Sequence, residues 1–193
     1  MTKNIKTLIG IFCLGGMMLS AGLFTSCTEN DDTVEEYANW QSKNETYWDN
    51  LYTTTQQKIK GGDTSWKIIL NYTFQNQKQT TGSALTYRPE NYIIAHVEQA
   101  GTGTTSPLYS DSVSMHYMGR LIPSTTYTAG LIFDKSWSSN TFNAATSRPN
   151  HSYIGLSYDS KGKPISLVDG FTTALMSMHR GDHWTVYIPH QLG

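Results

Sequence analysis

From Tyr92 onward, the sequence is a series of short strand-like segments separated by turns and interrupted by one short helical segment. The strand-like segments are rich in β-branched and aromatic residues, and Trp184 to Ile188 alternates apolar and polar positions before Pro189 ends it. The helical segment runs from Gly170 to Met178. Because segments joined by short turns pair in the antiparallel sense, this pattern predicts an α+β domain of antiparallel strands around one helix.

The remaining strands are predicted from the same residue types. They are Tyr92 to Glu98, Asp111 to Leu121, Leu131 to Asp134 and Ser152 to Leu156. Trp66 to Phe74 fits either a strand or an extended linker, and the polar residues Gln75 to Gly82 predict a loop.

The first 26 residues predict a signal for export rather than part of the fold. Lys3 and Lys6 are followed by an uncharged apolar run from Leu8 to Phe24, and the run ends at Thr25-Ser26-Cys27. This ending resembles a bacterial lipobox, in which the peptide is cleaved before the cysteine and the thiol receives a lipid. We therefore expect lipidation at Cys27, with an uncleaved anchor helix as the alternative.

An acidic segment, 27–33, follows the predicted cleavage site and continues into two glutamates. Such a run resembles the surface-export signal of lipoproteins from Bacteroidetes-like bacteria. A solvated tether that holds the domain away from the bilayer explains it equally well. Either way, the sequence predicts a lipid-anchored protein of the bacterial cell envelope, most readily at the outer membrane.

Residues 34–60 are predicted to form an amphipathic helix. Together with the linker that follows, this helix makes up an N-terminal segment, 34–84. Thr33 and Glu36 have the spacing of a capping box, and Gly61-Gly62 ends the segment. Aromatic residues recur along it near the helical period. They would pack on the helix's own domain or, as the alternative, form a homodimer or docking arm.

Composition excludes several classes of protein. Lys and Arg number 14 against 15 Asp and Glu, so the chain is not a strongly basic nucleic-acid binder. The only cysteines, Cys13 and Cys27, have no metal-ligand spacing. Gly101-x-Gly103 lacks the third glycine of a dinucleotide site, and His116 has no partner residue that would mark it as a base. We therefore expect neither a metal nor a cofactor.

Four motifs occur in order in the C-terminal half of the chain. They are Val113-Ser114-Met115-His116-Tyr117-Met118-Gly119, Phe133-Asp134-Lys135-Ser136, Leu167-Val168-Asp169-Gly170-Phe171 with the following Ala174-Leu175 and Met178, and Gly181-Asp182-His183-Trp184-Thr185-Val186-Tyr187-Ile188-Pro189. In order and spacing they resemble the FKBP-type peptidyl-prolyl cis-trans isomerases. The resemblance covers about residues 85–193 and leaves the helix at 34–60 unexplained.

The resemblance implies a twisted antiparallel sheet of about five strands around one short helix. It also implies an aromatic pocket that isomerises X-Pro bonds in proline-containing segments of unfolded or exported proteins. By position in the motifs, Tyr117 and Phe133 would form walls of this pocket, and Asp134 would orient Tyr117 by a hydrogen bond. Leu167 and Val168 would close one side, with the Val168 N–H donating to a substrate carbonyl, and Phe171 would form the floor.

The chain differs from the family pattern at three places. Phe171 stands where the family usually has Trp, and either Phe142 or Tyr153 could supply a further aromatic wall. The family also continues through a further strand beyond the position of Gly193, so we expect an isomerase domain at 85–193 that is C-terminally incomplete. Phe171 and the missing strand favour one alternative, a non-catalytic prolyl-peptide-binding or chaperone lipoprotein. The Tyr and Trp content would fit another, a surface lipoprotein with a glycan-binding or adhesive domain, but the four motifs argue against it.

Overall fold

A computed structural model describes residues 35–77 and 85–193 of the protein. The predicted signal peptide, Cys27, the acidic tether and Thr33 of the capping box lie outside the described residues. Among the helices that are described, none has the length and apolar character needed to cross a bilayer.

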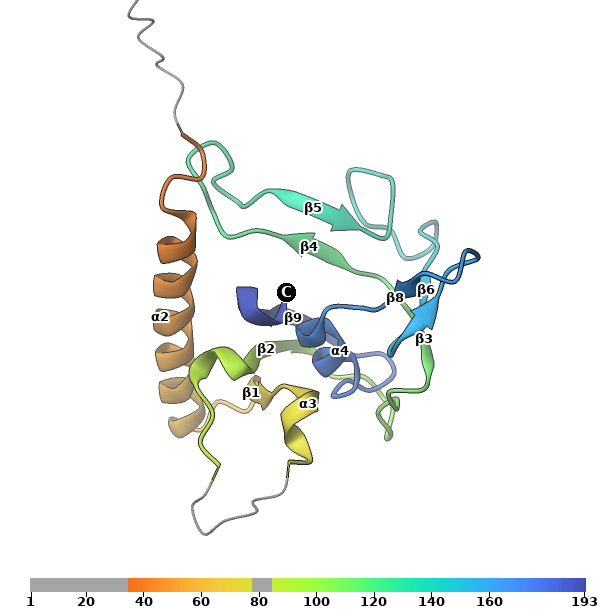
Figure 1. Cartoon of the computed structure of the whole chain (residues 1–193), viewed down its shortest axis with the longest axis horizontal. Coiled ribbons are helices and arrows are strands. Elements are labelled where there is room, and N and C mark those ends of the chain that lie inside the picture. Colours follow the sequence, from red (N-terminus) through yellow and green to blue (C-terminus); the bar gives the residue numbers. More distant parts are fainter. Residues whose placement is uncertain (1–34, 78–84) are drawn as a thin grey trace, which may run out of the picture. The chain divides into compact units, whose positions relative to one another are not determined.

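The centre of the fold is a three-stranded antiparallel sheet in the order β1-β2-β9 (Figure 1). Its strands are β1 (Trp66–Leu70), β2 (Tyr92–Gln99) and β9 (His183–Tyr187). The helix α4 (Asp169–Leu175) covers one face, where Ile93 and Ala174 are fully buried with Leu192. Ile69, Val186 and Ile188 pack against this cluster. Alternate residues of each strand therefore form the core, as the period of two predicts.

The long helix α2 (Trp40–Lys60) packs on the opposite face of the sheet. The rings of Tyr52 and Tyr92 lie 5.9 Å apart, and Lys58 Nζ lies 3.8 Å from the ring centre of Trp66. Trp48 is buried, whereas Tyr37 and Tyr47 remain partly exposed. Part of the aromatic stripe therefore packs on its own domain, as the first of the two interpretations predicts.

The helix begins later than the sequence indicates. Its first residue is Trp40 rather than residue 34, and Asn39 at the N-cap is left-handed with a φ of 52° and no side-chain cap. Glu36 does not close a capping box, because its carboxylate accepts hydrogen bonds from Ser124 and Thr126 instead.

The other strands form separate antiparallel pairs rather than one continuous sheet. The pairs are β3 (Ser112–Met115) with β6 (Asn150–Tyr153), β4 (Met118–Arg120) with β5 (Ile132–Lys135), and β7 (Ser157–Tyr158) with β8 (Pro164–Ile165). The short helices are α3 (Tyr72–Gln75), η1 (Pro89–Asn91) and η2 (His190–Leu192). The α+β class is confirmed, with the antiparallel strands divided among one sheet and three pairs.

Two predicted strands are each interrupted where a side-chain oxygen accepts a hydrogen bond from a backbone N–H. Asp111 to Leu121 divides into β3 and β4, because the Tyr117 N–H donates to the Ser136 hydroxyl at 3.1 Å rather than to a strand. Trp66 to Phe74 stops being a strand at Leu70, because the side chain of Asn71 accepts from the Thr73 N–H at 3.3 Å and starts α3.

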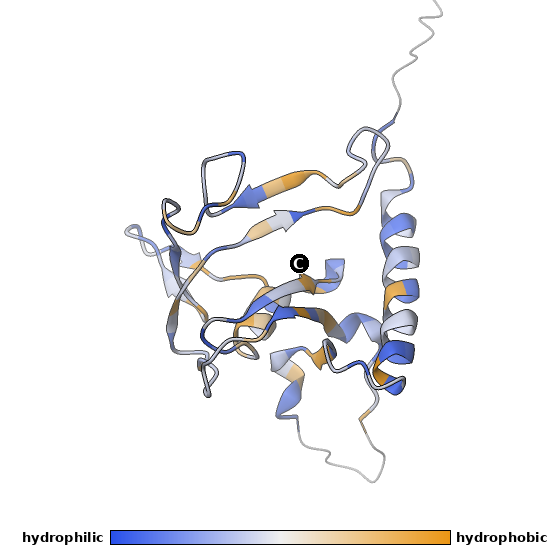
Figure 2. Cartoon of the chain, turned by 180° about the vertical axis from the view of Figure 1, so that it is seen from behind, coloured by the Kyte–Doolittle hydropathy of each residue, from blue (hydrophilic) through white to orange (hydrophobic). Residues whose placement is uncertain are grey.

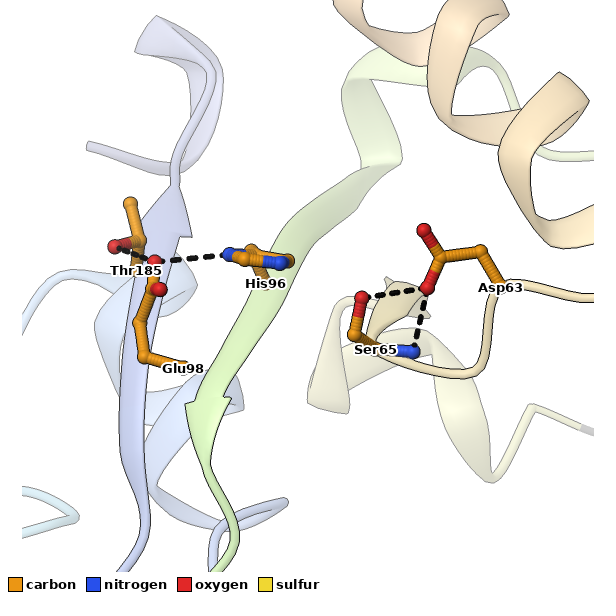
Figure 3. Close-up of polar contacts among 5 residues, drawn as sticks. All are labelled: Asp63, Ser65, His96, Glu98 and Thr185. Atoms are coloured by element: carbon orange, nitrogen blue, oxygen red, sulfur yellow. Dashed lines mark hydrogen bonds and ion pairs between the residues drawn. The ribbon is translucent and has the colours of Figure 1, made fainter.

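Two separate groups of polar side chains support the sheet (Figure 3). One group joins two of its strands, and the other fixes the turn after α2. Glu98 accepts from the Thr185 hydroxyl at 2.8 Å and lies 2.9 Å from His96 Nδ1, which joins β2 to β9. These contacts, the one with His96 first, hold the pKa of Glu98 below its usual range. Asp63 accepts from the hydroxyl and the N–H of Ser65 and so fixes the turn that leads into β1.

Candidate functional site

A deep cleft of about 2030 Å³ opens beside the free edge of β9. Its walls come from α2, β4, β5, the start of α4 and β9. The volume exceeds the ~300–1,000 Å³ of an ordinary small-molecule pocket. The cleft is therefore larger than such a pocket, and the predicted pocket residues form one part of its lining.

All six predicted site residues line this one cleft. They are Tyr117, Phe133, Asp134, Leu167, Val168 and Phe171. They come from three separate parts of the sequence, namely the start of β4, the strand β5 and the segment that enters α4. The fold therefore brings together residues that the motifs place far apart in the chain.

Tyr117 and Asp134 form the polar contact of the site. The phenol of Tyr117 donates to Asp134 Oδ2 at 2.7 Å. This hydrogen bond, with desolvation second, raises the pKa of Tyr117 above its usual value, so the phenol remains a donor at neutral pH. The rings of Tyr117 and Phe171 lie 5.8 Å apart and tilted by 59°. Asp134 thus holds the Tyr117 ring in place beside Phe171, and both rings line the cleft.

Phe133 lies at the open side of the cleft and is 65% exposed. Its ring crosses β4 at Gly119, where any side chain would collide with it. Figure 2 shows β5 as hydrophobic in its first half and hydrophilic at its end, and its apolar residues Ile132 and Phe133 are largely open to solvent. An exposed aromatic ring on a cleft wall is available to a ligand without any rearrangement of the core.

The segment before α4 completes the other side of the pocket. Leu167 is half-buried, whereas Val168 is exposed and occupies the N-cap position of α4. The carbonyl of Val168 accepts from the Thr172 N–H at 3.0 Å, which begins the helix. Its own N–H makes no hydrogen bond to any residue in 35–77 or 85–193. A backbone donor of a residue that lines the cleft is therefore left without a partner in the described structure.

Of the two candidates for a further aromatic wall, Phe142 lines the cleft and Tyr153 does not. The ring of Phe142 lies 4.9 Å from that of His116 and 5.0 Å from that of Trp137. His116 therefore packs against an aromatic ring. The sequence could not distinguish the two candidates, because the segment between them aligns poorly with the family pattern.

Sequence reasoning missed the contribution of α2 and β9 to the cleft. Trp48 of α2 and Trp184 of β9 both line it, and their indole N–H groups are buried without a hydrogen-bond partner in the described structure. The aromatic spacing of 34–60 was the available signal, but it does not say which surface the helix faces. Within the described residues, no group of three or more His, Cys, Asp and Glu side chains is arranged to hold a metal ion.

Comparison with known proteins gives one distant similarity. No family model matches the chain. A stretch of 119 residues, 62% of the chain, is 28% identical to the Macrophage infectivity potentiator of Trypanosoma cruzi, a protein of the FKBP type. The match covers 48% of that relative, so the chain spans about half of its length. The similarity agrees with the motif resemblance at the level of the FKBP type.

Proposed function

We propose that the protein is a peptidyl-prolyl cis-trans isomerase of the FKBP type. The observation that carries the proposal is the convergence of Tyr117, Phe133 and Phe171 on one cleft, with Asp134 holding the Tyr117 phenol. The distant similarity to an FKBP-type protein supports the same activity.

The chemistry requires neither a nucleophile nor a metal. Amide resonance gives the X-Pro bond a rotation barrier of ~18–20 kcal/mol, and uncatalysed exchange takes tens to hundreds of seconds. Twisting the amide breaks this resonance and leaves the bond less polar than in its planar form. An apolar pocket therefore binds the twisted state better than the planar one, which lowers the barrier.

Each residue of the site has a task in this mechanism. The rings of Tyr117, Phe133 and Phe171 hold the proline ring and exclude water from the amide. The Val168 N–H donates to a substrate carbonyl next to the bond that rotates. Leu167 closes the side of the pocket, and Asp134 prevents the Tyr117 ring from turning away. Phe171, smaller than the usual Trp and without an indole N–H, leaves an apolar floor.

The substrates that we propose are proline-containing segments of exported proteins. The support is the predicted signal peptide and lipobox, with attachment to the cell envelope through a lipid on Cys27 and the outer membrane as the site. In this setting the enzyme assists the folding of proteins that have just crossed the inner membrane. The two exposed tyrosines near the start of α2, Tyr37 and Tyr47, would be the contact surface if the helix forms a homodimer.

A non-catalytic function is the second candidate. The width of the cleft and its lining by Trp48 of α2 favour a module that holds a prolyl segment without turning it over. Such a module would bind X-Pro peptides with the same aromatic residues. Binding without acceleration of isomerisation distinguishes it from the enzyme.

The test is the isomerisation rate of a short X-Pro peptide with the folded protein and with Phe133→Ala. Because Phe133 is exposed, its loss should leave the fold intact and lower kcat/KM about tenfold or more, the usual effect of removing a substrate-positioning group. Tyr158→Ala is the matched control, since Tyr158 is equally exposed at 65% and lies outside the cleft. A wild-type rate equal to the uncatalysed rate would remove the catalytic assignment.

A further inference from the structure

Glu36 makes a set of contacts that the proposed isomerase mechanism does not use. Its carboxylate accepts from the Ser124 hydroxyl, from the Thr126 N–H at 2.9 and 3.1 Å, and from the Thr126 hydroxyl at 2.5 Å. These contacts, with the Ser124 hydroxyl first, lower the pKa of Glu36 to about 2. A carboxylate that stays ionised makes charge-assisted hydrogen bonds, which are stronger than neutral ones.

The loop that binds Glu36 joins β4 to β5 and has its own internal hydrogen bonds. The Leu121 N–H donates to the Leu131 carbonyl at 2.9 Å where the loop leaves the strands. Within the loop, the Ser124 and Gly130 N–H groups donate to the Tyr127 carbonyl at 3.0 and 2.8 Å. A loop closed in this way moves as one piece with the hairpin of β4 and β5.

This hairpin has few other attachments to the domain. In the part of the chain that the structure describes, β4 and β5 pair only with each other. At one end of the hairpin, the Tyr117 ring packs against Phe171 of α4. At the other end, Glu36 joins the loop to the turn that precedes α2, and α2 is in turn fixed to the sheet through Trp48 and Tyr52.

We propose that Glu36 is a positioning residue for the pocket, because it fixes the far end of the hairpin that carries Tyr117, Phe133 and Asp134. This inference rests on the proposed function. It gives α2 a second task beyond covering the sheet, namely to hold a wall of the pocket.

The test compares the wild type with Glu36→Gln, which keeps the size of the side chain and removes its charge. The glutamine amide keeps one acceptor oxygen, but its NH2 group cannot accept, so the hydrogen bonds to Oε2 lose their acceptor and those to Oε1 lose the assistance of the charge. We expect kcat/KM for an X-Pro peptide to fall roughly tenfold, mainly through a higher KM, because the displaced wall also binds the proline ring. Glu35→Gln, which alters the exposed neighbouring carboxylate, should leave both parameters unchanged.

A second measurement does not depend on activity. In Glu36→Gln, the NMR signals of the Tyr117 and Phe133 rings should shift, and the Thr126 amide should exchange faster with solvent. Thr126→Val removes the hydroxyl contact and keeps the N–H contact, so it should shift the same ring signals by less than Glu36→Gln does. Adding it to Glu36→Gln should change these signals by less than the sum of the two single effects, because both variants act on the same contact. Thr126→Val also serves as the test variant if Glu36→Gln does not fold.

Unchanged ring signals in the folded variants would overturn the positioning role, and so would altered signals with unchanged kcat/KM. An inactive wild type would refute the proposed function instead. In that case the ring signals alone decide whether Glu36 fixes the hairpin, so the two failures remain distinguishable.

Discussion

Gly119 and Phe133 show how single residues shape the pocket. A side chain at position 119 would collide with the Phe133 ring, so the absence of one lets the ring lie across β4 and reach the cleft. Both residues belong to the motifs that carry the family resemblance. The resemblance predicted Tyr117 and Phe133 as walls of one pocket, and both line the cleft, whereas the contact between Gly119 and Phe133 was not predicted.

Other residues of the site could not be predicted. Glu36 has the spacing of a capping box, and nothing local distinguishes that use from a contact with Ser124 and Thr126, which lie far along the chain. Phe142 and Tyr153 are likewise equivalent in sequence, and only the path of the chain between β5 and β6 places Phe142 in the cleft. Long-range contacts of this kind leave no periodic signal in the sequence.

The hydroxyl of Tyr117 provides a test at this scale. Tyr117→Phe keeps the aromatic wall and removes the hydrogen bond to Asp134. We expect kcat/KM to fall by about tenfold or more, since a hydrogen bond to a charged group contributes ~1.5–3 kcal/mol and about 1.4 kcal/mol corresponds to a factor of ten. Isomerisation kinetics and thermal unfolding measure the two effects. Tyr158→Phe is the control on an exposed strand, and equal kinetics in both variants would contradict the role of the hydroxyl.

Among the elements, the turn at Gly101 and Gly103 packs closely on a second turn. Its glycines allow this approach, since added side chains would collide with the backbone at Arg180. Asp182 joins the two turns by accepting from the Gly101 N–H at 2.6 Å and the His179 N–H at 2.8 Å. Burial opposes its ionisation, but these hydrogen bonds outweigh burial and lower the pKa of Asp182.

We predict that Asp182→Ala destabilises the domain. The side chain is only 5% exposed, so its removal leaves two amides without an acceptor, at a cost of ~1–3 kcal/mol in the free energy of unfolding. Denaturant unfolding measures this cost. Asp159→Ala is the matched control, because Asp159 accepts from the amides of Lys161 and Lys163 in a turn that water can reach. An equal loss in both variants would show that burial does not set the cost.

Element boundaries were less predictable than element types. The strands β2, β5 and β9 lie within one residue of their predicted ranges, because period and turn residues mark them. The helix α4 begins one residue before its predicted start, Gly170, and ends three residues before its predicted end, Met178. The prediction of one strand from Asp111 to Leu121 was wrong, because in the middle of this segment the Tyr117 N–H donates a hydrogen bond to the Ser136 hydroxyl. The start of α2 was wrong by six residues, 40 against 34, because the carboxylate expected to cap it is used elsewhere.

At the scale of the whole molecule, the α+β class followed from the pattern of the segments, but the grouping of the strands did not. One sheet and three separate pairs contain the same kinds of strand that a single sheet would contain. Which strands pair depends on contacts between distant residues, such as Ile94 with Tyr187. Local propensity carries no information about such partners.

The lipid anchor also belongs to this scale, because it determines where the whole domain works. If Cys27 carries the lipid, the protein should partition with membranes, since two or more acyl chains give stable anchoring whereas one gives only marginal binding. Cys27→Ala should then lack the lipid and show the altered gel mobility of an unprocessed chain. Cys13→Ala is the matched control, because that residue lies in the apolar run that cleavage removes and should leave partitioning unchanged. Membrane association that persists in Cys27→Ala with unchanged mobility would favour the uncleaved anchor helix.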